Sequence, residues 1–554
     1  MLNFSSLNRP QYIQQLREAS FDVLIIGGGI TGAGIALDAC SRGLKVALID
    51  MNDFASGTSS KSTKLIHGGL RYLKQLEFQL VAEVGKERKI IHRIAPHLTR
   101  PEPMLLPLVT NGSLSKFSAR LGMWVYEKLA GVDKKEWHKN LSVDETKKIE
   151  PLLNTEGLKG GILFYEYRTD DARLTIEVMK EAVSRGTIAL NYLKATSFLY
   201  KNKHISGANV VDQLSGEIFE INASYVINAS GPWVDKLTAF ETIHTENKLQ
   251  ITKGVHLVVD WKKLPLKQSM YFDTYDHRML FVIPREGKTY IGTTDTFYKD
   301  DMTRPTITME DRDYLLKCVT DFFPQNPIYA NDIESAWAGL RPLISKPSKG
   351  PSEISRKDEV FESSSGLLTI AGGKLTGYRK MAQRIVDIVT TKIQQHEHKK
   401  IAPCITSTIN LSGGKLKSNE TFHDFFQQQL KYGLSIGLTK EETETLLYRY
   451  GTNITKVFSL YETLKPETHQ LPLLLRAQII YSVKNEMCVS LSDFLIRRTG
   501  SLYFNIELVK QWKDDVSTYM QSILSWSDSL KNQFDIELKT TLDEIEAISN
   551  HSTK

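Results

Sequence analysis

The sequence predicts an α/β protein with three parts: a first domain built on a βαβ unit, a second domain around a mixed sheet, and an all-α C-terminal domain. Two apolar runs, residues 22–26 and 45–49, flank a glycine-rich turn and a helix-like segment, which is the pattern of a βαβ unit. Residues 251–295 alternate apolar and polar side chains as strands do. Beyond residue 414 the apolar residues recur at helical spacing.

Composition places the chain among globular proteins. Of its 554 residues, 41% are hydrophobic and 24% charged, so neither a disordered chain nor a low-complexity fibre fits. At roughly one domain per ~150 residues, three or four domains are expected. The net charge of +6 is small for this length, and it neither requires nor excludes nucleic acid or a membrane surface as a partner.

The remaining elements follow in order along the chain. Residues 1–20 are polar and fit a lead-in arm or a helix, and Gly43 ends the helix of the βαβ unit, predicted over 35–42. Serine, threonine and glycine predict loops, whereas the polar stretch before the C-terminal domain predicts a linker. The loops are 53–64 and 345–353; further helices are 70–94, 172–185 and 376–394; further strands lie within 188–211 and at 225–229 and 367–371.

Cysteines and apolar runs limit the cellular setting. Four cysteines at 40, 318, 404 and 488 lie far apart in sequence, so no metal-finger or redox spacing exists and a reducing cytosol is expected. The N-terminus lacks the charged-then-apolar pattern of a signal peptide. The apolar run at 24–37 is too short for a membrane span and contains five glycines, so we expect no integral membrane protein.

The strongest motif is a glycine turn between the first strand and its helix. Gly27, Gly29 and Gly32 have the GxGxxG spacing, and Asp50 follows the second strand 18 residues after Gly32. The first glycine allows a tight turn, the second allows close approach of a pyrophosphate, and the third allows the helix to pack on the strand, while the acid accepts from a ribose. A Rossmann-like dinucleotide site is predicted; the alternative is a glycine-rich turn in another α/β sheet.

Two later segments favour FAD over NAD. Residues 225–231 fit a strand and turn that return to the dinucleotide site. Residues 368–376 fit a strand, a glycine turn and a helix start, and such a helix N-terminus stabilises an anionic reduced flavin through its partial positive charge. Each segment alone is an ordinary strand and turn, but the three signals in this order favour FAD.

Several strings resemble the FAD-dependent, quinone-linked glycerol-3-phosphate dehydrogenases, a family of D-amino-acid-oxidase-like flavoproteins. They are residues 21–50, KLIHGGLRY at 64–72, ASGPW at 229–233, GTTD at 292–295, GLRP at 339–342 and GGKLTGYR at 372–379. The resemblance spans about residues 20–390, and a helical C-terminal domain is typical of the family. Asp50 stands where many relatives carry glutamate, and Gly377 where threonine is common.

The resemblance implies the reaction and its partners. It implies oxidation of sn-glycerol 3-phosphate to dihydroxyacetone phosphate by hydride transfer to FAD, in glycerol catabolism and phospholipid precursor metabolism. A membrane quinone would take the electrons, so a cytoplasmic protein held reversibly on the inner face of the cytoplasmic membrane is expected. No nucleic acid and no metal are expected, since His396 and His398 fit a solvated linker, and a homodimer is kept open.

The motifs and the resemblance together assign candidate site residues. Arginine forks suit a phosphate dianion, and a histidine of near-neutral pKa suits a base, whereas arginine does not readily lose a proton. His67 is expected to pack near FAD, and both Tyr72 and Trp233 are expected either to line the pocket or to pack in the core. The catalytic candidates are His256 and Arg341; the substrate-binding candidates are Arg71, Tyr72, Arg341, Arg356 and Lys374; the cofactor-binding candidates are Gly27, Gly29, Ile30, Thr31, Gly32, Asp50, Thr58, Ser59, Lys64, Leu65, His67, Gly68, Ala195, Ala229, Gly231, Gly373, Lys374, Leu375 and Thr376.

A domain division follows from these motifs and composition shifts. A discontinuous FAD-binding domain is expected at 20–95, 155–245 and 345–394, a substrate domain at 96–154 and 246–344, a linker at 395–414, and the helical C-terminal domain at 415–554.

Three other functions fit a flavoprotein of this composition less well. A glycerol-3-phosphate oxidase using oxygen is disfavoured, because such oxidases tend to carry an insertion and only 30 residues separate Arg341 from Gly372. An amino-acid oxidase would bind a carboxylate, against which the clustered arginines and family strings argue. A nucleic-acid-binding flavoprotein lacks support, because no basic patch interleaved with aromatic residues is present.

Overall fold

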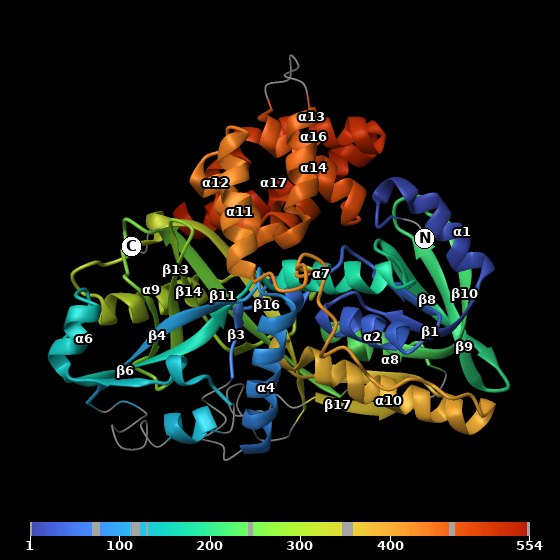
Figure 1. The fold of residues 1–554 in the computed structure, drawn as a ribbon, viewed down its shortest axis with the longest axis horizontal. Coiled ribbons are helices and arrows are strands. Elements are labelled where there is room, and N and C mark those ends of the chain that lie inside the picture. Colours follow the sequence, from blue (N-terminus) through green and yellow to red (C-terminus); the bar gives the residue numbers. More distant parts are fainter. Residues whose placement is uncertain are drawn as a thin grey trace.

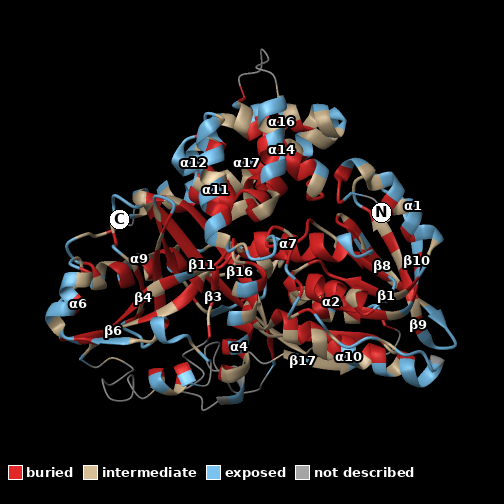
Figure 2. Ribbon diagram, in the orientation of Figure 1, coloured by how far each residue is buried: buried red, intermediate tan, exposed pale blue. Residues whose placement is uncertain are grey.

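The computed structural model describes residues 3–68, 78–110, 112, 122–128, 131–241, 248–345, 358–464 and 471–550. Two sheets lie side by side, and a layer of helices from the C-terminal part covers both along one edge (Figure 1). Buried residues run continuously through the two sheets and into this helical layer (Figure 2). The predicted α/β class with an all-α C-terminal domain is confirmed.

The first sheet has eight strands and is mostly parallel. Its central strand β1 pairs in parallel with β10 and β2, placing Ile25 opposite Ile227 and Leu48. These strands are apolar because the sheet is buried on both faces. The strand order is β17-β18-β10-β1-β2-β7, with β9 on β10 and β8 on β9. The bounds are β1 Ser20–Ile26, β2 Val46–Ile49, β7 Ile188–Leu190, β8 Leu193–Lys201, β9 His204–Asp212, β10 Ile218–Asn228, β17 Asp358–Glu362 and β18 Leu368–Gly372.

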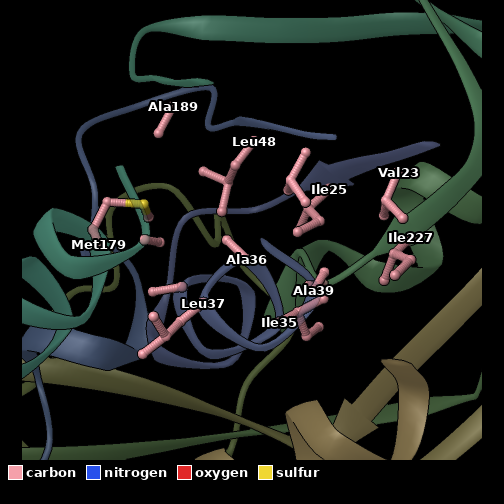
Figure 3. Packing of buried hydrophobic residues seen from close by; sticks show 14 of the residues in the cluster. Val23, Ile25, Ile35, Ala36, Leu37, Ala39, Leu48, Met179, Ala189 and Ile227 are labelled. Atoms are coloured by element: carbon pink, nitrogen blue, oxygen red, sulfur yellow. The ribbon is translucent and has the colours of Figure 1, made fainter. Parts of the chain in front are cut away.

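Helices cover the first sheet and complete its core. Helix α2, Ile30–Ser41, is buried along most of its length, and its small residues let it lie between the strands and other helices. Figure 3 shows Ile35 and Leu37 of this helix among Ile25, Leu48 and Met179. The other bounds are α1 Arg9–Glu18, α4 Phe78–Ile94, α7 Asp171–Ser184, α8 Val234–Thr238 and α10 Tyr378–Glu397.

The second sheet has ten strands and is mixed. Its pairs are antiparallel except for the parallel pair of β12 with β4. The order is β15-β11-β14-β13-β12-β4-β6-β3, with β16 on β11 and β5 on β6. The bounds are β3 Leu65–Ile66, β4 Arg100–Val109, β5 Lys139–Leu141, β6 Leu158–Arg168, β11 Leu249–Asp260, β12 Ser269–Asp273, β13 Met279–Arg285, β14 Lys288–Gly292, β15 Thr296–Phe297 and β16 Ile333–Ile344; helices α6 Val143–Ile149 and α9 Met309–Phe322 accompany it.

The C-terminal part is helical throughout its described residues after an irregular stretch at 398–421. Thr421 and Thr439 begin two of its helices with capping boxes, in which each side chain accepts from a backbone N–H one turn later. The bounds are α11 Phe422–Ser435, α12 Lys440–Tyr450, α13 Ile454–Thr463, α14 Leu473–Asn485, a π-helix η8 Asp493–Arg498, α15 Ser501–Phe504, α16 Ile506–Leu524 and α17 Asp528–Asn550.

Two sequence expectations differ from the structure in detail, and a third lies partly outside the described residues. The helix of the βαβ unit, α2, begins at Ile30 and not at residue 35, because it opens directly from the glycine turn. Within the helix expected over 70–94, residues 70–77 lie outside the described residues. Strands β3 and β6, which the expected division places in the first domain, pair in the second sheet. The division therefore stays a proposal, with these two strands moved to the substrate domain.

Candidate active site

A cavity of about 840 Å³ lies where the two sheets meet. Its wall combines the glycine turn after β1, the ends of β10 and β18, and one face of β11 and β16. Ligands of open α/β sheets bind at the carboxyl ends of parallel strands, which is where β1, β10 and β18 end here. The cavity therefore joins the expected cofactor site to the sheet expected to hold substrate.

The three motif glycines have different structural roles. Gly27 has φ +118°, and a Cβ atom there would lie 2.5 Å from the carbonyl oxygen of Ala229. A Cβ atom at Gly32 would overlap the carbonyl oxygen of Gly27, so this glycine allows α2 to pack on β1. At Gly29 a Cβ atom would meet only the Ser59 hydroxyl, at 3.1 Å, and the residue lines the cavity. Gly29 is thus the point at which a ligand can approach the backbone closely.

Asp50 closes the glycine turn from the end of β2. Its Oδ2 accepts from the N–H of Gly28 at 2.6 Å, and its Oδ1 accepts from the N–H of Asn52 at 2.8 Å. Burial raises the pKa of Asp50 to about 7, although the two backbone N–H groups oppose that shift. The carboxyl group lines the cavity and has the acceptor chemistry that a ribose hydroxyl requires.

Most of the expected cofactor residues line this one cavity, although they come from distant parts of the chain. Three do not line it: Gly32, Gly68 and Lys64. Gly68 donates its N–H to Glu166, and the Lys64 ammonium lies 2.6 Å from Asp171 in a buried ion pair. Those that line it are Gly27, Gly29, Ile30, Thr31, Asp50, Thr58, Ser59, Leu65, His67, Ala195, Ala229, Gly231, Gly373, Lys374, Leu375 and Thr376.

Two opposed glycines separate the two catalytic candidates on the second sheet. Strands β11 and β16 place His256 opposite Trp337, Gly254 opposite Gly339, and Thr252 opposite Arg341. Because these positions are two apart on each strand, their side chains share one face of the sheet. His256 and Arg341 therefore lie on either side of the paired glycines, with the Arg341 guanidinium over Gly254, and all four residues line the cavity.

His256 is held by its neighbours in a fixed orientation. Its ring stacks on Trp337 with centroids 4.7 Å apart and planes 12° apart, and only 1% of the residue is exposed. Nε2 lies 3.0 Å from the Thr63 hydroxyl, whereas Nδ1 is buried with no hydrogen-bond partner among the described residues. A Cβ atom at Gly292 would overlap the ring, so this glycine makes room for it.

The expectation of a near-neutral histidine needs correction. Burial lowers the pKa of His256 well below its usual value of 6.5, and the positive charges of Arg341 and Lys64 lower it further. The imidazole is therefore neutral at physiological pH, with a ring nitrogen available to accept a proton.

Arg341 presents its guanidinium over Gly254. Nη2 donates to the Thr293 hydroxyl at 3.0 Å, and Nη1 lies 3.2 Å from Asp295 in an ion pair that is largely buried. A Cβ atom at Gly254 would overlap Nη2, so only glycine allows the arginine to lie here. The partly exposed guanidinium retains the fork geometry that suits a phosphate.

The other substrate candidates divide into two groups. Lys374 lines the cavity at the start of the turn Leu375–Gly377, before α10. Arg71, Tyr72 and Arg356 lie outside the described residues. Trp233, whose place the sequence left open, lines the cavity.

Sequence reasoning missed several cavity residues. Thr63 and Thr293 contact the two catalytic candidates, Gly254 gives Arg341 room, and Gly292, behind the cavity wall, gives His256 room. A signal for the glycines was present, because a glycine inside a strand often marks close approach of a ligand or another chain segment.

Comparison with known proteins decides the family. The model for FAD-dependent oxidoreductases matches residues 22–379, and that for the C-terminal domain of alpha-glycerophosphate oxidase matches residues 404–531. Aerobic glycerol-3-phosphate dehydrogenase of Staphylococcus haemolyticus is 50% identical over 98% of this chain and 97% of its own length. That of Bacillus subtilis is 50% identical over 96% of each chain. The chain belongs to the aerobic glycerol-3-phosphate dehydrogenase family.

Solved structures agree with this membership of the aerobic glycerol-3-phosphate dehydrogenase family. The glycerol-3-phosphate dehydrogenase from Bacillus halodurans, complexed with FAD, superimposes with a TM-score of 0.85 at 44% identity and covers both chains fully. L-alpha-glycerophosphate oxidase from Mycoplasma pneumoniae covers 70% of this chain and 96% of its own with a TM-score of 0.55 at 17% identity, which shows the fold alone.

The residues present fit the cofactor of this aerobic glycerol-3-phosphate dehydrogenase family, and FAD is its cofactor. The open backbone at Gly29, the N-terminus of α2 and the buried acceptor Asp50 supply what a dinucleotide requires.

Among the described residues, no helix offers 18 residues apolar enough to cross a bilayer. The described part of the chain also has no group of three or more histidine, cysteine, aspartate or glutamate residues placed to hold a metal ion.

Proposed function

We propose that this protein oxidises sn-glycerol 3-phosphate to dihydroxyacetone phosphate, with FAD as the hydride acceptor and a membrane quinone as the final acceptor. The observation that carries the proposal is the placement of His256 and Arg341 on one face of the second sheet, in a cavity shared with the dinucleotide turn. An imidazole and a guanidinium on the same cavity wall suit a small substrate that carries a hydroxyl and a phosphate.

Arg341 binds the phosphate in this proposal. The dianion accepts from the guanidinium, and Lys374 adds a second positive charge from the cofactor side of the cavity. Arg71, Tyr72 and Arg356 stay proposed substrate-binding residues on the strength of their sequence motifs. Binding the dianion also places negative charge near Arg341, which raises the pKa of His256 from its low value in the free protein.

His256 acts as the base. One of its ring nitrogens accepts the proton of the C2 hydroxyl as the C2 hydrogen leaves with two electrons and the C2–O bond becomes a carbonyl. When bound, FAD supplies the acceptor of that hydride. The stack on Trp337 and the contact with Thr63 hold the imidazole at one angle, so its nitrogen keeps a fixed place relative to the bound substrate.

The glycine turn gives the first test of the cofactor site. Replacing Gly29 with Val should weaken FAD binding about 5- to 100-fold, because the side chain would crowd both Ser59 and the space of the pyrophosphate. The measurement is FAD bound per protein after denaturation and chromatography of the released flavin. Gly377→Ala is the matched control, since a Cβ atom there meets nothing within 4 Å. Equal flavin content in the two variants would remove Gly29 from the cofactor site.

Attachment to the membrane has its own test. We expect reversible binding to the inner face of the cytoplasmic membrane, motivated by the net charge of +6 and the need to reach a lipid-soluble quinone. Washing membranes at high salt should release most of the activity, because screening weakens contacts between basic side chains and anionic lipids. Activity that stays in the pellet through salt and alkaline carbonate would contradict peripheral attachment.

Oxygen is the alternative acceptor of the electrons from reduced FAD. One observation favours this alternative, because the family model that matches the C-terminal domain takes its name from an oxidase. An oxygen electrode separates the two acceptors. Without quinone, we expect glycerol 3-phosphate to cause little oxygen uptake, whereas rapid uptake would establish the oxidase.

A further inference from the structure

A buried carboxylate, Asp53, connects the cofactor-binding part of the chain to the C-terminal domain. Its side chain is fully buried just after Asp50. Arg498 donates to both of its oxygens, with Nη1 at 2.7 Å from Oδ2 and Nη2 at 2.9 Å from Oδ1. Arg497 donates from Nε to Oδ2 at 2.5 Å, and the Asn191 amide donates to Oδ1 at 2.9 Å. Two arginines of the π-helix η8 thus hold one carboxylate more than 440 residues earlier in the chain.

The C-terminal domain also fixes the positions of these two arginines. Arg498 donates to the carbonyl oxygen of Glu486 from both Nε and Nη2. Arg497 donates to Asp493 at 2.6 Å, and Asp493 in turn accepts from the backbone N–H groups of Val489 and Ser490. The guanidinium groups therefore form part of a rigid framework, and Asp53 is the group they hold.

Asp53 is rigidly connected to the dinucleotide turn. The ring of Phe54, the next residue, packs directly against Gly28, and a Cβ atom on Gly28 would overlap that ring. The N–H of Ala55 donates to the carbonyl oxygen of Gly28 at 3.1 Å, while the N–H of Gly28 donates to Asp50 at 2.6 Å. A displacement of Asp53 would therefore move the segment 50–55 and, with it, the acceptor and the turn that line the cavity.

We propose that Arg497 and Arg498 are positioning residues for the cofactor: the C-terminal domain holds segment 50–55 against the glycine turn through Asp53 and thereby sets the affinity for FAD. This rests on the proposed cofactor role of Asp50. Stability alone does not account for the arrangement, because a buried ion pair adds little net stability over apolar residues of similar volume.

A second buried network at the same interface provides a matched control. Arg173 of α7 donates to Glu486 from both Nη1 and Nη2, at 2.8 and 2.7 Å, and is as deeply buried as Arg498. Neither Arg173 nor Glu486 lines the cavity. Weakening this pair acts on the Glu486 carboxylate, whereas Arg498 contacts the backbone carbonyl of that residue, so every hydrogen bond to Asp53 stays in place.

The test compares Arg498→Lys and Arg497→Lys with Arg173→Lys in the full-length protein. FAD is removed from each variant, its dissociation constant is measured by quenching of flavin fluorescence on rebinding, and the urea midpoint of the apoprotein is recorded. Coupling through such networks is worth about 2- to 30-fold in affinity, so the first two variants should bind FAD more weakly by that factor. Arg173→Lys should lower the urea midpoint comparably and leave the dissociation constant near that of the wild type.

Two results would overturn the proposal. One is wild-type FAD affinity in a folded Arg498→Lys variant, or in Arg497→Lys if the former does not fold. The other is equal weakening by Arg173→Lys, which would show a general effect of stability. The Asp50→Asn variant distinguishes failure of the positioning role from failure of the cofactor site. If Asp50→Asn binds FAD as tightly as the wild type, the assigned cofactor site is wrong. If Asp50→Asn binds FAD more weakly while the arginine variants bind it normally, only the positioning role is wrong.

Discussion

Replacing His256 with Asn should slow anaerobic reduction of the bound flavin by glycerol 3-phosphate about 10²–10⁴-fold, the range that a positioned general base contributes. The variant should keep FAD, because His256 lies on β11 of the second sheet, away from the glycine turn. Asparagine is smaller than histidine, so it fits the space between Trp337 and Gly292 that the imidazole occupies. Its amide is polar, so the Thr63 hydroxyl still faces a polar group.

Stopped-flow absorbance isolates this step from turnover with quinone. The matched control is His277→Asn, because His277 also lines the cavity, is exposed, and has φ +61°, which asparagine tolerates. The control should reduce its flavin at close to the wild-type rate. Reduction of the His256→Asn flavin at that same rate would remove the histidine from the mechanism and leave Lys374 or a bound water as the base.

The pH dependence of the same step follows from the lowered pKa of His256. As a base, His256 stops working in the free protein only when its imidazole gains a proton. Burial and the charges of Arg341 and Lys64 lower the pKa of the imidazole, so that protonation occurs well below pH 6.5. The second-order rate of flavin reduction reports the free protein and the free substrate, so the phosphate of glycerol 3-phosphate, with a second pKa of about 6, contributes an acidic decline of its own, and His256 should add none near pH 6.5. A half-height at pH 6.5 that vanishes in the Asn variant would show that the histidine titrates normally.

Replacing Arg341 with Ala should lower kcat/KM for glycerol 3-phosphate roughly ten- to hundredfold or more, because the loss of one charge-assisted hydrogen bond costs about 1.5–3 kcal/mol. Activity with glycerol, which has no phosphate, should be low in the wild type and hardly change in the variant. The sequence predicts the same outcome for Arg356→Ala.

Steady-state kinetics with both substrates checks this role. Arg278→Ala is the matched control, since Arg278 also lines the cavity but belongs to the turn between β12 and β13 and pairs with Asp276. Arg341→Lys adds a second comparison: a partial loss would show that the fork matters as well as the charge. Equal losses with glycerol 3-phosphate and glycerol would assign Arg341 another role, such as holding Thr293 and the start of the loop at Asp295.

The sequence predicted those features that depend on neighbours in the chain. Apolar runs and the glycine spacing identified β1, α2 and β2, because a βαβ unit forms within about thirty residues and Gly32 packs against the turn itself. The mixed second sheet and the helical C-terminal part also followed from periodicity. His256 and Arg341, which the resemblance assigned to the site, line the cavity.

Features set by long-range pairing were not accessible in this way. Strand β3 joins the second sheet because Leu65 pairs with Arg168, about a hundred residues later. The Arg341 guanidinium lies over Gly254 only in the register that sets Gly254 opposite Gly339. The low pKa of His256 likewise depends on burial, and on the charges of Arg341 and Lys64, which the fold brings to it. Lys64, expected at the cofactor, instead lies against Asp171, a partner that no local spacing indicates.

The central claim is that FAD in this protein accepts two electrons from glycerol 3-phosphate, and anaerobic absorption spectroscopy tests it most directly. The purified protein should show the oxidised flavin bands, and glycerol 3-phosphate added without oxygen or quinone should bleach them, whereas equal additions of glycerol or of an amino acid should not. A flavin that stays oxidised with glycerol 3-phosphate, or that an amino acid bleaches instead, would contradict the account.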